Sequence, residues 1–157
     1  MADDFERRLR RAAHDHAVKS EAQDRANERE KQDREKFVVD FRSKVRSVIE
    51  PTMLRAGRIV EETGRVKFSV DIMDGRESTT DSVSLILRTR KKLSMLAYIA
   101  DPVDMRVNVV RTDNEPPETF GIEKNTRRTP VADCELEAID FASVENDIAG
   151  FAELFLT

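Results

Sequence analysis

The sequence predicts an α+β fold: a long charged N-terminal helix, then an antiparallel sheet of about four to six strands packed by a kinked helix and a C-terminal helix. Three observations predict it. Residues 1–36 hold ten acidic and ten basic side chains without Gly or Pro. Apolar residues then recur at helical spacing up to Gly64, and beyond it the apolar period falls to two. We therefore expect a charged extended helix over 1–36 and a single α+β domain over 37–157.

The charged segment carries many acid–base pairs four residues apart, in the order that favours side-chain contact and the helix dipole. Each such pair stabilises a helix by about 0.2–0.5 kcal/mol. They are Asp3/Arg7, Asp4/Arg8, Glu6/Arg10, Asp15/Lys19, Glu21/Arg25 and Glu30/Arg34. An apolar seam at Phe5, Leu9 and Ala12 becomes polar further along, so it is too weak for a strong coiled coil. A second stripe of small residues includes Ala26. Two interpretations stay open: a solvated single helix, or a weak oligomerisation or docking helix that uses Phe5, Leu9, Ala12 and Ala26.

The next segment predicts a helix that packs on the core. Phe37, Phe41 and Val45 begin an apolar stripe at helical spacing, and Met53 continues it. Pro51 lies inside this stripe, where it removes a hydrogen bond and crowds the carbonyl of the residue four positions earlier, so a kink or a restart is expected there. Gly64 is well placed to end the helix.

Alternating apolar residues then predict a meander of antiparallel strands, separated by Asp-Gly and Asp-Pro turns. The predicted strands are 66–72, 83–87, 93–100 and 105–111, with Thr89–Lys92 as a hairpin tip. Residues 93–100 are apolar on both faces, as expected for a central strand. Further along we expect a short edge strand at Phe120 and Ile122, a basic loop over 124–130 and another strand over 134–139. Val144, Ile148, Phe151 and Phe155 predict a final helix, capped by Asp140 or Ser143.

Composition restricts the function classes. Residues 65–157 carry twelve basic and seventeen acidic side chains, which argues against a large nonspecific polyanion-binding surface. Cys134 is the only cysteine, and the chain opens without the apolar stretch of a secretory signal, so we expect a cytoplasmic protein. No apolar run approaches the roughly 20 residues of a membrane helix, and no membrane partner is expected.

Catalytic and metal-binding patterns are weak throughout. His14 and His16 are the only histidines and diverge by about 200° on a helix, so they do not chelate a metal, and the domain has no histidine for acid–base work. Acidic neighbours disfavour a reactive Cys134. Asp71, Asp74, Asp101 and Asp104 are candidates for a carboxylate site, but three of them fit ordinary turns. No glycine-rich phosphate loop is present, so no cofactor, metal or catalytic residue is assigned and an enzyme is disfavoured.

These observations favour a non-enzymatic protein–protein interaction or assembly module, which binds another protein or itself as a homo-oligomer. The alternative is a nucleic-acid-binding accessory protein. Its phosphate contacts would be Arg88, Arg90, Lys91, Lys92, Arg127 and Arg128. With one Tyr and no Trp for base stacking, nucleic acid is the second choice. An enzyme with an unrecognised carboxylate site ranks third.

Overall fold

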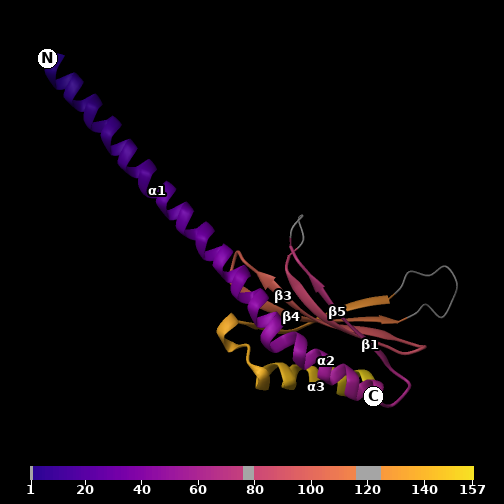
Figure 1. The fold of residues 1–157 in the computed structure, drawn as a ribbon. Helices are drawn as coiled ribbons and strands as arrows, with labels where there is room; N and C mark the ends of the chain where they lie inside the picture. The colour runs from indigo at the N-terminus through magenta and orange to yellow at the C-terminus, as the bar shows by residue number, and fades with distance from the viewer. Residues whose placement is uncertain (1, 76–79, 116–124) are drawn as a thin grey trace. The chain divides into compact units, whose positions relative to one another are not determined.

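The computed structural model describes residues 2–75, 80–115 and 125–157. The chain forms two compact units, Met1–Lys36 and Phe37–Thr157. The first helix, α1 (Ala2–Lys44), contains the whole described part of the first unit, and its last residues belong to the second. The α+β class predicted from the sequence is confirmed, with a five-stranded antiparallel sheet and a C-terminal helix (Figure 1).

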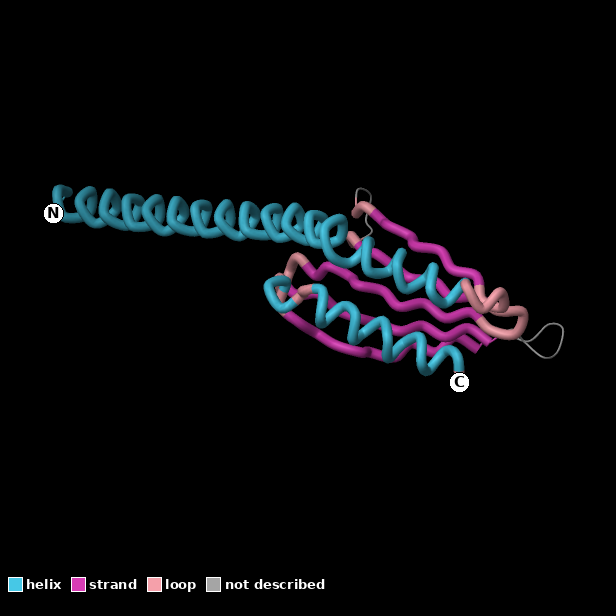
Figure 2. The backbone as a smooth tube through the Cα atoms, turned by 60° about the horizontal axis from the view of Figure 1, so that its bottom comes forward, coloured by secondary structure: helices cyan, strands magenta, loops and turns pink. Residues whose placement is uncertain are grey.

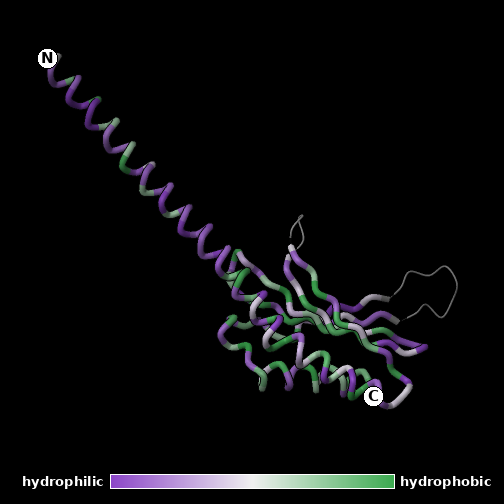
Figure 3. Tube along the Cα trace, viewed as in Figure 1, coloured by the Kyte–Doolittle hydropathy of each residue, from purple (hydrophilic) through white to green (hydrophobic). Residues whose placement is uncertain are grey.

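Every residue from Asp3 to Lys36 is exposed. Figure 3 shows that this stretch of α1 is much more hydrophilic than the central strands are. Ion pairs four residues apart form at Glu6–Arg10, Glu21–Arg25 and Glu30–Arg34, with N–O distances of 3.6–3.9 Å. The pairs predicted at Asp3/Arg7, Asp4/Arg8 and Asp15/Lys19 are not among the ion pairs of the described residues. The helix in this unit rests on local hydrogen bonds and weak surface pairs, because it buries no apolar stripe.

The interruption predicted near Pro51 takes the form of a π-helical segment, η1 (Val45–Ile49), followed by α2 (Glu50–Glu61). The N–H of Glu50 donates to the carbonyl of Val45, five residues back. Pro51 has no N–H to offer, and a wider turn just before it lets the helical path continue. The helix ends near Gly64, whose φ of +73° is the left-handed conformation that glycine adopts readily.

The sheet is a simple meander in which each strand pairs with the next one in sequence. Its strands are β1 (Lys67–Met73), β2 (Ser82–Arg88), β3 (Leu93–Asp101), β4 (Arg106–Glu115) and β5 (Asn125–Cys134). A register shift between Val109 and Val110 leaves Val131 as the extra residue on β5. The predicted hairpin tip at Thr89–Lys92 is present, and its ends are joined by a hydrogen bond from the Thr89 N–H to the Lys92 carbonyl, at 2.9 Å.

The C-terminal helix α3 (Phe141–Leu156) follows a short 3₁₀ turn, η2 (Leu136–Ala138). The capping predicted at its start uses both candidate residues. Asp140 is the N-cap and accepts from the Ser143 N–H at 2.8 Å, while the Ser143 hydroxyl accepts from the Asp140 N–H at 3.0 Å. This reciprocal capping box fixes where the helix begins.

One hydrophobic core lies between the helices and a single face of the sheet. α2 and α3 lie side by side over that face (Figure 2). The strands contribute every second residue to this core: Val83, Leu85, Leu87, Leu96, Tyr98, Ala100, Val107 and Val109. The helices contribute Phe37, Phe41, Val45, Val48, Ile49, Met53, Val144, Ile148, Phe151 and Phe155. The apolar stripes predicted for both helices are therefore confirmed as core.

Three local predictions are wrong. Residues 125–130 form the start of β5 rather than a loop, because they complete the hydrogen bonding of β4 from Val110 to Glu115. The strand predicted over 134–139 is instead the end of β5 and η2, where the chain turns to reach α3. Met105 is an exposed turn residue with φ +52°, and the strand begins one residue later. The edge strand predicted at Phe120 and Ile122 lies outside the described residues.

Candidate functional site

The first candidate surface in the described residues is the sheet face opposite the core. Register places its side chains in rows across the strands, because paired residues of an antiparallel sheet point to the same side. We call this surface the open face. Its members on the three central strands are Ser82, Ser84, Ile86, Arg88, Leu93, Met95, Ala97, Ile99, Asp101, Arg106, Asn108, Val110, Thr112 and Asn114. Both α2 and α3 lie on the other side of the sheet (Figure 1).

Strand β3 gives the open face its apolar centre. Leu93, Met95, Ala97 and Ile99 alternate with the core residues of the same strand, so β3 is apolar on both sides. Ala97 is 4% exposed and is buried by its neighbours, whereas Leu93, Met95 and Ile99 are half-buried. A strand with two apolar faces is typical of a sheet covered on both sides. Within the second unit, the described residues cover only one face of this sheet.

Charged side chains form the rim of the open face. On β5, Arg128 lies opposite Thr112, and Asp133 lies opposite Asn108. The Arg106 Nε donates to Asp133 Oδ1 at 2.6 Å, and this pair is largely solvated, with Asp133 61% exposed. On β1, the edge strand, Asp71 lies in the row of Ser84 and Ala97. An apolar centre with a polar rim is the usual anatomy of a protein interface.

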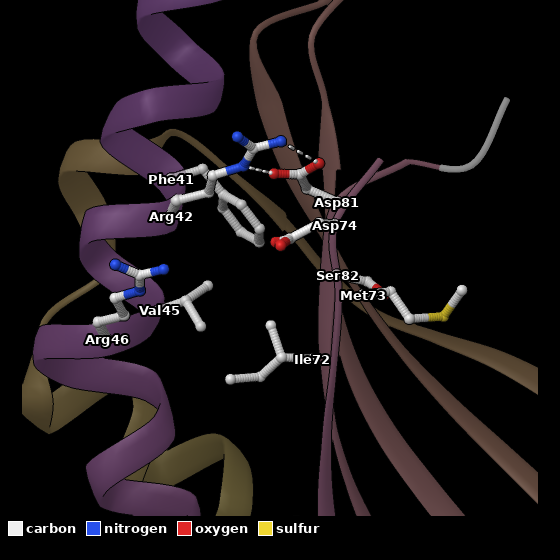
Figure 4. Close-up of a pocket in the computed structure, with 9 residues that line it drawn as sticks. All are labelled: Phe41, Arg42, Val45, Arg46, Ile72, Met73, Asp74, Asp81 and Ser82. Atoms are coloured by element: carbon white, nitrogen blue, oxygen red, sulfur yellow. Dashed lines mark hydrogen bonds and ion pairs between the residues drawn. The ribbon is translucent and has the colours of Figure 1, made fainter. Parts of the chain in front are cut away.

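A second candidate is a pocket of about 80 Å³ that lies between the end of α1 with η1 on one side and the β1–β2 edge on the other (Figure 4). Its lining includes an ion pair in which the Arg42 guanidinium meets the Asp81 carboxylate through both Nε and Nη2, the latter at 3.2 Å from Oδ1. The Gly75 N–H also donates to Asp81 Oδ1, at 2.5 Å. These donors fix the turn after β1, so Asp81 has a clear structural role.

The chemistry of this pocket is limited. Burial raises the pKa of Asp81, but the hydrogen bonds from Arg42 and Gly75 and the Arg42 charge outweigh it, so this pKa lies below its ordinary value. Asp81 is therefore ionised at neutral pH and has no proton to donate. A volume of about 80 Å³ holds only about two or three water molecules. Ligand pockets are typically about 300–1,000 Å³, so a substrate does not fit here.

The core contains a third group of polar side chains. The Tyr98 hydroxyl donates to Asp147 Oδ2 at 2.7 Å and joins β3 to α3. Burial and then Asp147 raise the pKa of Tyr98 well above its ordinary value. Burial and then Asp147 also raise the pKa of Cys134, so this thiol stays protonated at neutral pH. The expectation of an unreactive cysteine is consistent with this environment.

The carboxylates proposed from the sequence do not converge. Asp71 lies on the rim of the open face, and Asp74 lines the small pocket. Asp101 accepts hydrogen bonds from the backbone N–H groups of Val103 and Asp104, at 3.1 and 3.2 Å, as a turn residue does. Among the described residues no group of three or more His, Cys, Asp and Glu side chains is placed to hold a metal ion.

The basic residues proposed for phosphate contacts are divided between surfaces. Arg127 lies opposite Asp113 and Arg128 opposite Thr112, so these two side chains point to opposite faces of β5. The Lys92 ammonium lies 4.8 Å from the ring centroid of Phe155, on the helix side. Arg88, Arg90 and Lys91 are exposed at and next to the hairpin tip. The structure does not gather the six residues into one basic patch.

The seam residues of the first unit remain open to solvent. Phe5 and Leu9 are 65% and 55% exposed, and Ala12 and Ala26 are also exposed. Their role in docking or oligomerisation stays a prediction.

Sequence reasoning missed the open face, although the signal was present. In residues 93–100 both alternating sets of side chains, one for each face of the sheet, are largely apolar. A sheet with helices on one side buries only one of these two sets. Comparison of the chain with protein-family models, with curated proteins and with solved structures finds no match. Among the described helices, none combines the length and the apolar character that crossing a bilayer requires.

Proposed function

We propose that this chain is a non-enzymatic protein–protein interaction module that associates through the open face of its sheet, with the charged helix of residues 1–36 as an additional docking element. The observation that carries the proposal is the apolar character of β3 on both faces. One face is buried by the helices, and the other presents Leu93, Met95 and Ile99 at its centre.

The physical argument rests on solvation. Contiguous apolar surface in water is unfavourable by about 25 cal/mol per Å², and a protein that keeps such a patch with a polar rim commonly uses it for binding. Solvent-facing positions on a sheet are usually polar, as Lys67 and Ser69 are on β1. The central strand departs from this pattern from Leu93 to Ile99, and only Asp101 at its end is charged on this face.

The charged helix supports the same function. A segment of 36 residues contributes nothing to the core, since the core cluster begins at Phe37. Its exposed Phe5 and Leu9 are the apolar residues with which a partner helix would pack. Each such contact adds only modest apolar burial, so this helix assists association rather than driving it.

The test compares two matched substitutions in the full chain. Ile99→Lys places a charge on the open face, and Ile59→Lys makes the same change at a residue 58% exposed on α2. We would measure solution mass by light scattering and, with the tagged full chain in cells of the native host, the amount of each co-purified protein. Ile99→Lys should reduce the mass or the recovery of a defined partner, whereas Ile59→Lys should not.

Thermal unfolding of both variants is the control that would show whether they are folded. If Ile99→Lys changes neither the mass nor the set of recovered proteins, the open face is not a binding surface and the proposal fails. The nucleic-acid alternative is tested separately with labelled single- and double-stranded DNA and RNA at low salt. Phosphate contacts would make the affinity fall steeply as salt rises, and Arg88→Ala with Arg128→Ala would reduce that slope.

A further inference from the structure

We infer that the occupant of the open face is a second copy of this chain, stacked face to face about a two-fold axis that runs across the strands. This inference rests on the proposed function and specifies its partner. Such an interface is isologous: if a first residue of one copy contacts a second residue of the other copy, the reverse contact also forms. The face must therefore be complementary to itself. The rows of the sheet allow that condition to be checked.

An axis across the strands through Ala97 places the row of Met95 above the row of Ile99 in the other copy. On β3 Met95 then meets Ile99, whereas on β2 Ile86 meets Ser82. In the same rows Thr112 comes to lie above Asn108, and both are polar. The row on the axis meets its own copy. On β2 to β5 it contains Ser84, Ala97, Val110 and Pro130, which are small or of medium size and let the sheets approach to the usual spacing of about 10 Å, and Asp71 lies at its β1 end.

The charges on β5 favour this axis in particular. Arg128 and Asp133 lie opposite Thr112 and Asn108, which are four residues apart on β4 and hence about 13 Å apart. They are too distant to pair with each other within one chain, where Asp133 Oδ1 instead accepts from Arg106 Nε at 2.6 Å. The other oxygen of this largely exposed carboxylate has no partner among the hydrogen bonds of the described residues. The axis across the strands brings Arg128 of each copy above Asp133 of the other and forms two ion pairs. An axis along β3 would instead put β1 above β5 and place Ser69 above Arg128, which forms no pair.

The area is sufficient for a weak dimer. Five strands of about seven residues cover about 550 Å² per copy, or about 1,100 Å² for the pair. Stable interfaces begin at about 1,200 Å² in total, so the dimer should dissociate at micromolar concentrations. Three features oppose it: Asp71 meets its own copy at the β1 rim, Leu93 lies above Asp101 of the other copy, and Ile86 lies above Ser82. The Asp71 pair is exposed and costs little.

The experiment uses charge reversal in the full chain, measured by sedimentation velocity over a range of concentrations. Arg128→Asp and Asp133→Arg should each weaken dimerisation on the order of tenfold, because each replaces two attractive pairs between the copies with two repulsive ones. Asp133→Arg also removes the pair with Arg106 inside each copy, so thermal unfolding of this variant is the check that it is folded. An equimolar mixture of the two variants should dimerise as the wild type does, since every reversed position then faces an opposite charge. Asp71→Asn should strengthen the dimer, and Ile59→Lys is the neutral control.

The outcomes separate this inference from the proposed function. Restoration of the dimer in the mixture supports the inference. A wild type that is monomeric at all concentrations, or single variants that dimerise like the wild type, would overturn it. In either of those cases, loss of partner recovery with Ile99→Lys would still support the open face as a binding surface for a different protein.

Discussion

The contact between α2 and β1 offers a sharp test of the packing that leaves the other sheet face open. Gly57 is buried on α2 against the ring of Phe68 on β1. A Cβ added at Gly57 would lie 2.2 Å from Phe68 Cδ2, 2.5 Å from Cγ and 2.6 Å from Cε2. Ordinary carbon contacts are about 3.5–4.0 Å, so the ring or the helix would have to move by more than about 1 Å.

Two opposing effects determine how much Gly57→Ala changes the free energy of unfolding. Gly→Ala inside a helix stabilises by about 1 kcal/mol through backbone entropy and helix propensity. Overpacking of a core contact typically costs about 1–3 kcal/mol. Gly57→Ala should therefore destabilise the domain by up to about 2 kcal/mol. In a Phe68→Ala background the clash is gone, and the same change should stabilise by about 1 kcal/mol.

Urea unfolding at one fixed protein concentration measures all four members of this cycle. Gly150→Ala is the matched control, because nothing lies within 4 Å of a Cβ added on α3, and it should stabilise by about 0.5–1 kcal/mol. The reasoning is refuted if Gly57→Ala stabilises the wild-type chain as much as Gly150→Ala does, or if Phe68→Ala leaves the effect of Gly57→Ala unchanged.

Three further predictions follow from the polar contacts and from the unit boundary. Asp81→Asn should destabilise by about 1–3 kcal/mol at neutral pH by leaving Arg42 without its partner. Because the folded pKa of Asp81 is lowered, this contribution is present above the unfolded pKa and is lost as pH falls below about 4, so urea unfolding of variant and wild type should converge there. Tyr98 is the only tyrosine and its pKa is raised, so it should stay protonated in the fold as pH rises past about 10, and tyrosinate absorbance should appear only together with unfolding; an earlier rise would contradict the hydrogen bond to Asp147. Removal of residues 1–36 should leave the thermal midpoint of the remaining domain nearly unchanged while weakening association, as measured by calorimetry and light scattering; a large fall in the midpoint would show that the helix stabilises the domain.

Local pattern determined much of this protein from the sequence alone. The helical stripe from Phe37 to Met53, the alternation on β1 to β4 and the apolar positions of α3 are periodic, and periodicity is set by backbone geometry within each segment. The turn at Thr89–Lys92 and the cap at Asp140 are likewise local. The element types were therefore predictable, and so were most of the core residues.

Only the tertiary structure decided which face of the sheet the helices cover and which strand edges are paired. Residues 125–130 have the composition of a loop, yet β4 supplies unpaired backbone groups that draw them into a fifth strand. The two apolar faces of β3 were visible in the sequence, but they are equivalent until α2 and α3 pack on one of them. That choice depends on contacts between residues far apart in the chain, which no local pattern encodes, and it is what leaves Met95 and Ile99 outside the core.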